Sequence, residues 1–446
     1  MKQIMLTAVL CILTYSNTSA ENLLDVYNLA RNNDAEFRAE TATYYASRQI
    51  APQRRAALLP QLSGRVSSTE NKNETEGRGS FDEGGNSRFS YSVSLDQSLY
   101  DHGQWQRLKQ ANIRVAQAEA DYAVAQQELI LRAAEAYFNV LAAEDNLRFA
   151  QSETRSVGQQ LEQAKQRFQV GLIAITDVKE SQAQYDQAVA DEIAAQNLLD
   201  ENRETLWTIT NTDIARLAPL GENIALKTPE PANKQEWVDR ALNSNLSLLS
   251  SGFRRDAARK EISIQRSGHY PTLSLNASRS FTDTEYDEGS EINILNFQSR
   301  DQEETRDSVS VRLSIPIYSG GATHAGVKEA IYRYDATRDQ YELTRRRTIK
   351  QARDAYQNTV ADISRVKALK QALVSSQAAY EATEAGFEVG TRNSVEVLLS
   401  LRNTFRAERD YARTRYDYVL NTLRLKEAVG NLTLDDIKAI NRWLKK

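Results

Sequence analysis

The sequence predicts an α+β protein made of two similar halves, each with a pair of amphipathic strands and long helices. Three observations support this prediction: long stretches without glycine or proline, strict apolar–polar alternation just before two of them, and motifs that recur at a nearly constant offset. The chain has 446 residues, a net charge of −4 and a mean hydropathy of −0.58, with no apolar run near 20 residues. These values exclude a polytopic helical membrane protein and give no basis for a nucleic-acid partner. They leave open a membrane β-barrel, whose strands alternate without a hydropathy peak.

Residues 1–20 have the pattern of a secretory signal peptide. Lys2 is followed by a short apolar segment, and small residues lie before Glu21. The apolar segment is too short to span a membrane as a helix. Because the only cysteine, Cys11, lies in this segment, the exported chain has no disulfide and no thiolate metal site.

Three stretches contain neither glycine nor proline: residues 104–157, 327–385 and 391–429. Apolar residues in the first stretch recur at alternating steps of four and three, which is typical of a helix near the coiled-coil repeat. If the helix passes Gly158 and continues to residue 170, it is about 100 Å long at 1.5 Å per residue. The sequence therefore predicts either a long coiled coil or a wall of helices.

Strand signals precede the two longest helical stretches. Apolar residues alternate with polar ones from Phe89 to Leu95 and from Val309 to Ile317, and weaker alternation is present at 62–66 and 273–277. Polar segments, about 70–87 and 281–306, separate the members of each pair. We expect four strands, each with one apolar and one polar face.

The chain is an internal duplication. Motifs around Pro60 and Pro271 match at an offset of 211, and the segments 136–139 and 168–171 match 355–358 and 387–390 at an offset of 219. We predict a first repeat over residues 21–217, with strands near 60–100 and long helices over 104–206. A linker over residues 218–234 leads to a second repeat over residues 235–446, with strands near 270–318 and long helices over 326–430.

Four strands with one apolar face cannot close a barrel, because small closed barrels need about eight strands. Open strand edges are not tolerated in lipid, where unpaired backbone groups find no water. Several subunits must therefore contribute strands to one barrel. Two chains would supply eight strands and a filled interior, whereas three would supply twelve strands and an open lumen, with the helices continuing as a tube into the aqueous compartment.

The chemistry-bearing residues form no catalytic or metal-binding pattern. The segment 321–326 resembles a phosphate-binding loop, but the lysine and hydroxyl residue that should follow are replaced by Val327, Lys328 and Glu329. His102, His269 and His324 stand alone, without ligand spacing around them. We expect no enzyme activity, no cofactor and no metal site.

Several motifs resemble the TolC family of outer-membrane efflux channels over nearly the whole exported chain. They are the segments Arg167–Val178, Gly386–Arg392, Ala136–Leu141, Leu313–Gly321 and Asn245–Leu249. The resemblance implies a homotrimer with a twelve-stranded barrel in the lipid of the outer membrane and a helical barrel in the periplasm. It also implies a periplasmic adaptor protein and an inner-membrane pump of the RND, ABC or MFS type. Drugs, detergents or protein toxins would leave through this duct in multidrug efflux and type I secretion.

The resemblance also assigns functional residues by motif. Thr176 and Asp177 would face Arg392 on a neighbouring helix and hold a periplasmic gate shut, with Glu396 forming an acidic ring. Two positions depart from the family: Leu399 replaces a second acidic residue, and Phe387 replaces a tyrosine that bonds the aspartate. Both departures weaken the expected lock. The segments matching the adaptor-docking tips contain Val170, Gly171, Leu172, Val389, Gly390 and Thr391.

Two other classes of protein share some of these features with an efflux duct. A periplasmic adaptor also combines a helical hairpin with β segments, but it does not have two strand pairs at a constant offset. An enzyme or a secreted coiled-coil scaffold is disfavoured by the missing catalytic residues and by the amphipathic strands.

Overall fold

The computed structural model describes residues 20–77, 80–222, 224–286, 291–292, 297–298 and 301–445. Apart from Ala20, the predicted signal peptide lies outside the described residues. The chain forms two compact units: a strand-containing unit of residues 42–122 and 246–345, and a helical unit made of the remaining residues. Two long helices, α4 (His102–Gln169) and α8 (Ala322–Glu388), contribute residues to both units.

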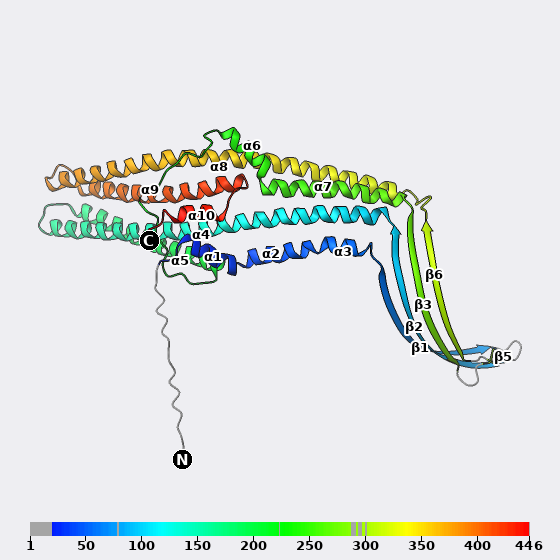
Figure 1. Cartoon of the computed structure of the whole chain (residues 1–446). Helices are drawn as coiled ribbons and strands as arrows, with labels where there is room; N and C mark the ends of the chain where they lie inside the picture. The colour runs from blue at the N-terminus through cyan, green and yellow to red at the C-terminus, as the bar shows by residue number, and fades with distance from the viewer. Residues whose placement is uncertain are drawn as a thin grey trace, which may run out of the picture. The chain divides into compact units, whose positions relative to one another are not determined.

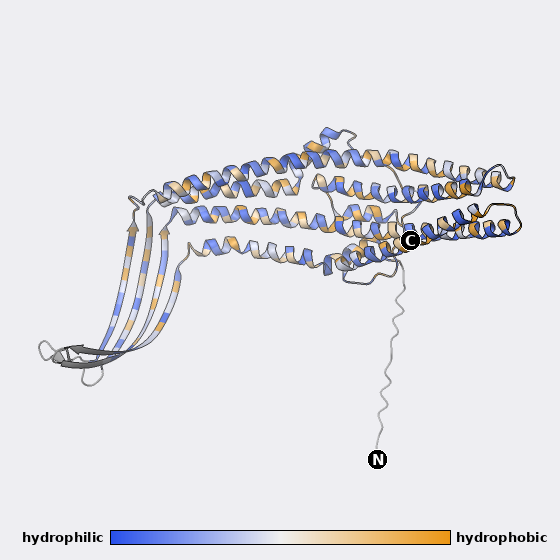
Figure 2. Cartoon of the chain, turned by 180° about the vertical axis from the view of Figure 1, so that it is seen from behind, coloured by the Kyte–Doolittle hydropathy of each residue, from blue (hydrophilic) through white to orange (hydrophobic). Residues whose placement is uncertain are grey.

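The strand-containing unit has a four-stranded antiparallel sheet in the order β1-β2-β3-β6 (Figure 1). Its strands are β1 (Gln61–Gly77), β2 (Ser80–Tyr100), β3 (Thr272–Tyr286) and β6 (Gln302–Ser314). The register places apolar residues opposite each other, as in Leu62 with Leu95 and Leu273 with Leu313. Apolar and polar residues alternate along the strands (Figure 2), so one face of the sheet is apolar and the other polar.

The strands are longer than the sequence predicted. The segments predicted as polar loops, 70–87 and 281–306, contribute much of their length to the strands, and only residues 287–301 separate β3 from β6. A short pair, β4 (Glu291–Ile292) and β5 (Phe297–Gln298), lies in that interval. The prediction was wrong because the polarity of a side chain indicates only whether it faces solvent. The hydrogen bonds of a β-sheet are formed by backbone groups, which can pair whether the side chains are polar or apolar. The alternating pattern also predicted a strand as far as Ile317, but β6 ends at Ser314, two residues before Pro316, which has no N–H to donate.

Helices of the strand-containing unit include α3 (Ile50–Ala56) and α7 (Leu246–Arg266), followed by the 3₁₀ helix η1 (Ser267–His269). Polar contacts join α7 to α4: Gln110 donates to the carbonyl of Ala257 and to the carboxylate of Glu261, both at 2.9 Å. Ser250 donates a short hydrogen bond to Asp121. Among the described residues, no helix has both the length and the apolar character needed to cross a membrane.

The helical unit contains α1 (Leu23–Asn33), most of α4 and α8, α5 (Ile175–Thr210), α6 (Lys234–Ser244), α9 (Ser394–Ala428) and α10 (Leu434–Asn441); α2 (Ala35–Arg48) is divided between the units. Its core includes Tyr137, a fully buried tyrosine whose hydroxyl donates to the carbonyl of Ala218 at 2.6 Å. Backbone bridges join Glu21 to Leu217 and Leu220 to Leu444. The segment after α5 is thereby tied to both ends of the folded chain.

Two helical hairpins dominate this unit: α4 with α5, and α8 with α9 (Figure 1). The first helix passes Gly158 without interruption and ends at Gln169. A Cβ atom at Gly158 would lie 3.1 Å from the ring of Tyr185 on α5. This glycine therefore lets the two helices of the hairpin approach closely.

Candidate functional site at the ends of the two hairpins

The turn of the first hairpin is a glycine-terminated helix cap. Gly171 has a φ of 76°, a left-handed conformation that L side chains rarely adopt. The N–H of Leu172 donates to the carbonyl of Arg167, and the N–H of Gly171 to that of Phe168, both at 2.9 Å. This pair of bonds is the Schellman motif, which satisfies carbonyls at the end of α4.

The second hairpin repeats the motif. Gly390 has a φ of 80°, the N–H of Thr391 donates to Gly386 at 2.8 Å, and the N–H of Gly390 donates to Phe387 at 3.1 Å. The duplication detected in the sequence is therefore also a duplication of backbone geometry.

Apolar side chains project from both turns. Val170, Leu172 and Val389 are 70%, 72% and 76% exposed. Gly171, Gly390 and Thr391 are exposed beside them. Such uncovered valine and leucine side chains give each hairpin end a small apolar surface.

Two of the predicted gate residues lie in the first turn of α5. Thr176 is exposed and Asp177 is partly exposed. Within the part of the chain that the structure describes, the Asp177 carboxylate forms no ion pair. The N-cap residue of this helix, Ala174, has no side chain able to cap it.

The structure brings two other gate residues together at the start of α9. Arg392 lies 2.9 Å from Glu396, four residues along the chain. Asn393 caps α9 by accepting the N–H of Glu396 at 2.9 Å, and its amide donates to the Glu396 carboxylate at 3.1 Å. The start of α9 is therefore fixed by its own side chains, unlike the start of α5.

Phe387 has a partner that the sequence analysis missed. The guanidinium of Arg167 lies over its ring, 4.2 Å from the centroid, and so joins the end of α4 to the end of α8. A cation over an aromatic face is attracted by the ring quadrupole. The only sequence signal was an Arg and a Phe in matching turns of the two halves, which gives no indication of contact.

Below the turns, the four helices share a small core. Val157 on α4 and Leu398 and Leu401 on α9 are buried, and Tyr185, Tyr380 and Phe405 pack around them. The Tyr380 hydroxyl donates to Glu384 at 2.7 Å, and burial together with this carboxylate raises the pKa of Tyr380.

Closer to the middle of the hairpins, buried polar contacts join α4 to α9. Arg409 lies 2.7 Å from Glu153, whose side chain is 7% exposed. The buried hydroxyl of Tyr416 donates to Asp145 at 2.8 Å, and burial is the main reason that the pKa of Tyr416 is raised. Further along, Arg424 pairs with Glu135 at 2.7 Å.

One carboxyl in this region is strongly perturbed. Burial raises the pKa of Glu427 on α9 to about 7, with the negative charges of Glu128 and Glu135 acting in the same direction and Arg424 opposing them.

A cavity of about 470 Å³ lies between α4, α5 and α9, lined mainly by polar residues such as Asn146, Asn202 and Arg413. No group of three or more His, Asp or Glu side chains in the described ranges is placed to hold a metal ion.

The amphipathic sheet and the paired helical hairpins are the elements of an outer-membrane channel protein, and the comparisons agree. The profile of the family described as "Outer membrane efflux protein" matches residues 26–212 and again 237–431, once in each half. The chain belongs to this family and, within it, to the TolC channels. It is an exit duct of the outer membrane with a large periplasmic part.

Individual relatives support the same conclusion. The chain is 38% identical to "Outer membrane protein TolC" of Vibrio cholerae, over 96% of this chain and 94% of that protein. It is 30% identical to "Alkaline protease secretion protein AprF" of Pseudomonas aeruginosa, over 96% and 88%. In fold it is similar to the Campylobacter jejuni CmeC outer membrane channel, with a TM-score of 0.75 at 16% identity, over 96% and 91% of the two chains.

Proposed function

We propose that three copies of this chain form one channel, with a twelve-stranded barrel in the outer membrane and a tube of helices in the periplasm. The observation that carries the proposal is the four-stranded sheet, in which β1 and β6 each have one edge without a partner among the described strands. Exposed apolar residues such as Val66, Val93 and Val311 lie on its apolar face. Unpaired edges are costly in lipid, so the sheet needs the edges of neighbouring copies.

Crosslinking of the purified protein in detergent tests this assembly. Crosslinked species should stop at the trimer, which should resist SDS before heating. A ladder through dimer, tetramer and hexamer would contradict the proposal.

The duct passes substrates delivered by an inner-membrane pump through a periplasmic adaptor that docks on the hairpin ends. Support comes from the exposed Val170, Leu172 and Val389, which are costly to leave in water, and from relatives named for efflux and for protease secretion. Drugs, detergents and secreted proteins are the proposed cargo. Leu172→Glu should abolish export from cells while leaving the trimer intact, whereas Glu180→Gln on the exposed side of α5 should not.

The gate is formed where hairpin ends of neighbouring subunits converge, with Asp177 and Thr176 of one subunit facing Arg392 of the next. Support for this arrangement is that Asp177 has no ion-pair partner in its own subunit within the described residues. An exposed ion pair contributes about 0.2–1 kcal/mol, so three copies bias the closed state while an adaptor can still open it.

Single-channel recording tests the gate. Asp177→Ala and Arg392→Ser should each raise the conductance in planar bilayers, and Glu396→Gln should lower cation selectivity. Arg392 neutralises the charge of Glu396 within the same subunit. Arg392→Ser should therefore also increase cation selectivity, whereas Asp177→Ala should not. Unchanged conductance in the double variant would show that packing alone closes the entrance.

A further inference from the structure

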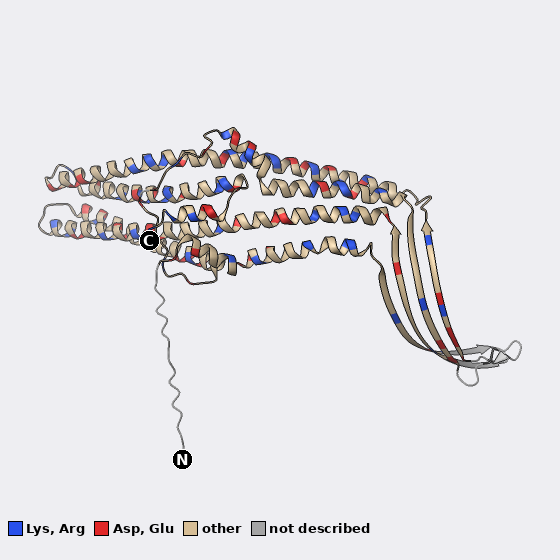
Figure 3. Ribbon diagram, viewed as in Figure 1, with Lys and Arg blue, Asp and Glu red and all other residues tan. Residues whose placement is uncertain are grey.

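Charge is unevenly distributed in the strand-containing unit (Figure 3). The segment 42–60, which leads into β1, contains three arginines and no acidic residue. The segment 102–118, which follows β2, contains two arginines and one lysine, and the first acidic residue of α4 is Glu119. The helix ends next to β1 and β2 are therefore basic.

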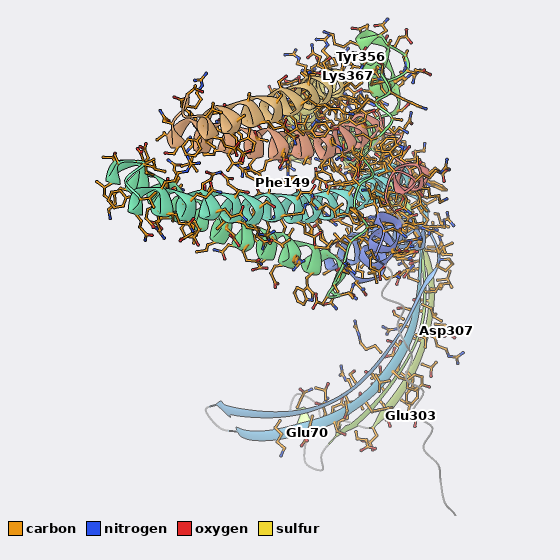
Figure 4. The ribbon with its side chains drawn as sticks, turned by 90° about the vertical axis from the view of Figure 1, so that its left-hand side faces the viewer. Glu70, Phe149, Glu303, Asp307, Tyr356 and Lys367 are labelled. Atoms are coloured by element: carbon orange, nitrogen blue, oxygen red, sulfur yellow. The ribbon has the colours of Figure 1, made fainter. Side chains whose placement is uncertain are left out.

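The other end of the sheet has an excess of carboxylates. The described ones on the strands are Glu70, Asp283, Glu285, Glu303, Glu304 and Asp307, three of which Figure 4 labels. They outnumber the cations Lys72, Arg88, Arg279 and Arg306 that lie among them, three of which form ion pairs with these carboxylates. The two ends of the apolar strand face thus differ in the sign of their charge.

The duplication repeats the basic positions. Arg55 and Arg266 occupy equivalent positions at the offset of 211, and Lys109 and Lys328 at the offset of 219. All four side chains are exposed, and in the described part of the chain none has a carboxylate within ion-pair distance. We call these four residues the basic collar.

The level of the basic collar matches that of lipid headgroups. Lys109 and Lys328 lie about 10 Å along their helices from the helix starts, and Arg266 ends α7 six residues before β3. Trp105, one turn before Lys109, is 50% exposed, and Tyr270 is 46% exposed. Aromatic residues of this kind mark the membrane–water interface. A headgroup layer is roughly 5–8 Å thick, so long cationic side chains near the strand ends reach its phosphates.

The side of the helix that carries Lys109 follows from its neighbour Arg107. Arg107 lines a cavity of about 500 Å³ together with Thr272 and Ser314. These two strand residues belong to the polar face of the sheet, because they alternate with Leu273 and Leu313. Lys109 is two residues further along the helix, roughly 200° around its axis, and therefore lies on the side of the apolar strand face.

We propose that the basic collar binds the phosphate groups of anionic phospholipids in the periplasmic leaflet of the outer membrane. Each cation near an anionic surface contributes about 1 kcal/mol at low salt, which corresponds to roughly a fivefold preference. Since the opposite end of the apolar face is acidic, the collar also favours one orientation of the barrel. The proposal depends on the outer-membrane location of the chain and not on the trimer or the gate.

Quenching of Trp105 fluorescence by brominated lipids tests the proposal. Trp105 is the one tryptophan of the strand-containing unit, and a Trp105→Phe variant gives the background to subtract. The full-length protein is reconstituted in phosphatidylcholine vesicles containing either brominated phosphatidylglycerol or brominated phosphatidylcholine. We expect the anionic lipid to be enriched several-fold around the wild type at 20 mM salt and to lose its advantage at 500 mM salt.

The variant Arg55→Gln, Arg266→Gln, Lys109→Gln, Lys328→Gln should lose this preference. The matched control neutralises four cations that already have carboxylate partners, Arg333, Arg338, Lys350 and Arg413, and should keep it. If the fourfold variant fails to insert, Lys109→Gln alone should still reduce the preference. Equal quenching by the two lipids around the wild type, or equal loss in the control, would overturn the proposal. If the protein instead binds purified peptidoglycan through the same four cations and shows no lipid preference, the basic collar is a peptidoglycan-binding site and the lipid proposal is wrong.

Discussion

The ends of the two hairpins and their middle are held together by different kinds of contact. In the middle, α4 and α9 are joined by Arg409 with the buried Glu153 and by Tyr416 with Asp145. At the ends, the stacking of Arg167 on Phe387 joins the two hairpins, while the exposed pair of Arg392 and Glu396 lies within the second hairpin. Buried polar pairs are costly to break, whereas exposed ones contribute little. The contacts between the hairpins are therefore weaker at their ends than in their middle.

The largest expected effect is in the middle. Arg409→Ala leaves the Glu153 carboxylate buried without a partner, which should lower the free energy of unfolding by on the order of 3 kcal/mol. Thermal unfolding followed by circular dichroism in detergent measures the loss. The double variant Glu153→Gln, Arg409→Ala should recover part of it. A loss in the single variant as small as that of Arg392→Ser would remove the distinction between middle and ends.

The next effect depends on pH. The pKa of Glu427 is raised to about 7, so the folded state favours the protonated carboxyl. The wild type should lose stability as the pH rises from about 4.5 to 7, and then level off. Glu427→Gln removes this penalty and should raise the melting temperature at pH 8, by the equivalent of about 1–3 kcal/mol, but not at pH 4.5. An equal rise in melting temperature at both pH values would show that packing, and not the charge of Glu427, causes the effect. Glu180→Gln, at an exposed position, is the control and should change the melting temperature at neither pH.

The two hairpin ends should differ in how firmly their second helices begin. Asn393→Ala removes a cap and should cost about 1 kcal/mol locally, whereas Ala174→Asn should stabilise the start of α5 by a similar amount. Amide hydrogen exchange in the first turns of α9 and α5 reports the two changes separately. Equal protection of the two turns in the wild type would contradict the asymmetry described above.

The smallest effect on stability is expected at Arg167 and Phe387. Phe387→Leu or Arg167→Gln should cost about 0.5–1 kcal/mol, too little to change the melting temperature much. Because the contact joins the two hairpin ends, single-channel conductance should nevertheless increase. Phe387→Tyr keeps the aromatic face and adds a hydroxyl that can bond to Asp177, so it should not raise the conductance. An increase for tyrosine as large as that for leucine would show that the ring face is not what holds the ends.

The sequence by itself determined the elements that depend on local backbone preference and periodicity. Uninterrupted helical spacing predicted a long helix from residue 104 to at least residue 157, alternation predicted four amphipathic strands, and Gly171 and Gly390 marked the turns. Family motifs within the two repeats identified the class of protein. These features could be predicted because they are encoded in residues close together along the chain.

The tertiary structure decided which residues meet. It extended β1 and β2 through the polar segment 70–87, since a pairing partner stabilises a strand whatever its side chains. It placed Arg167 on Phe387, and it paired Arg392 with Glu396 within the subunit, while the predicted contact between Asp177 and Arg392 stays a prediction about neighbouring copies. A charged or aromatic side chain on a long helix has several possible partners. Only the packing of helices from distant parts of the chain selects one, and no local pattern in the sequence records that choice.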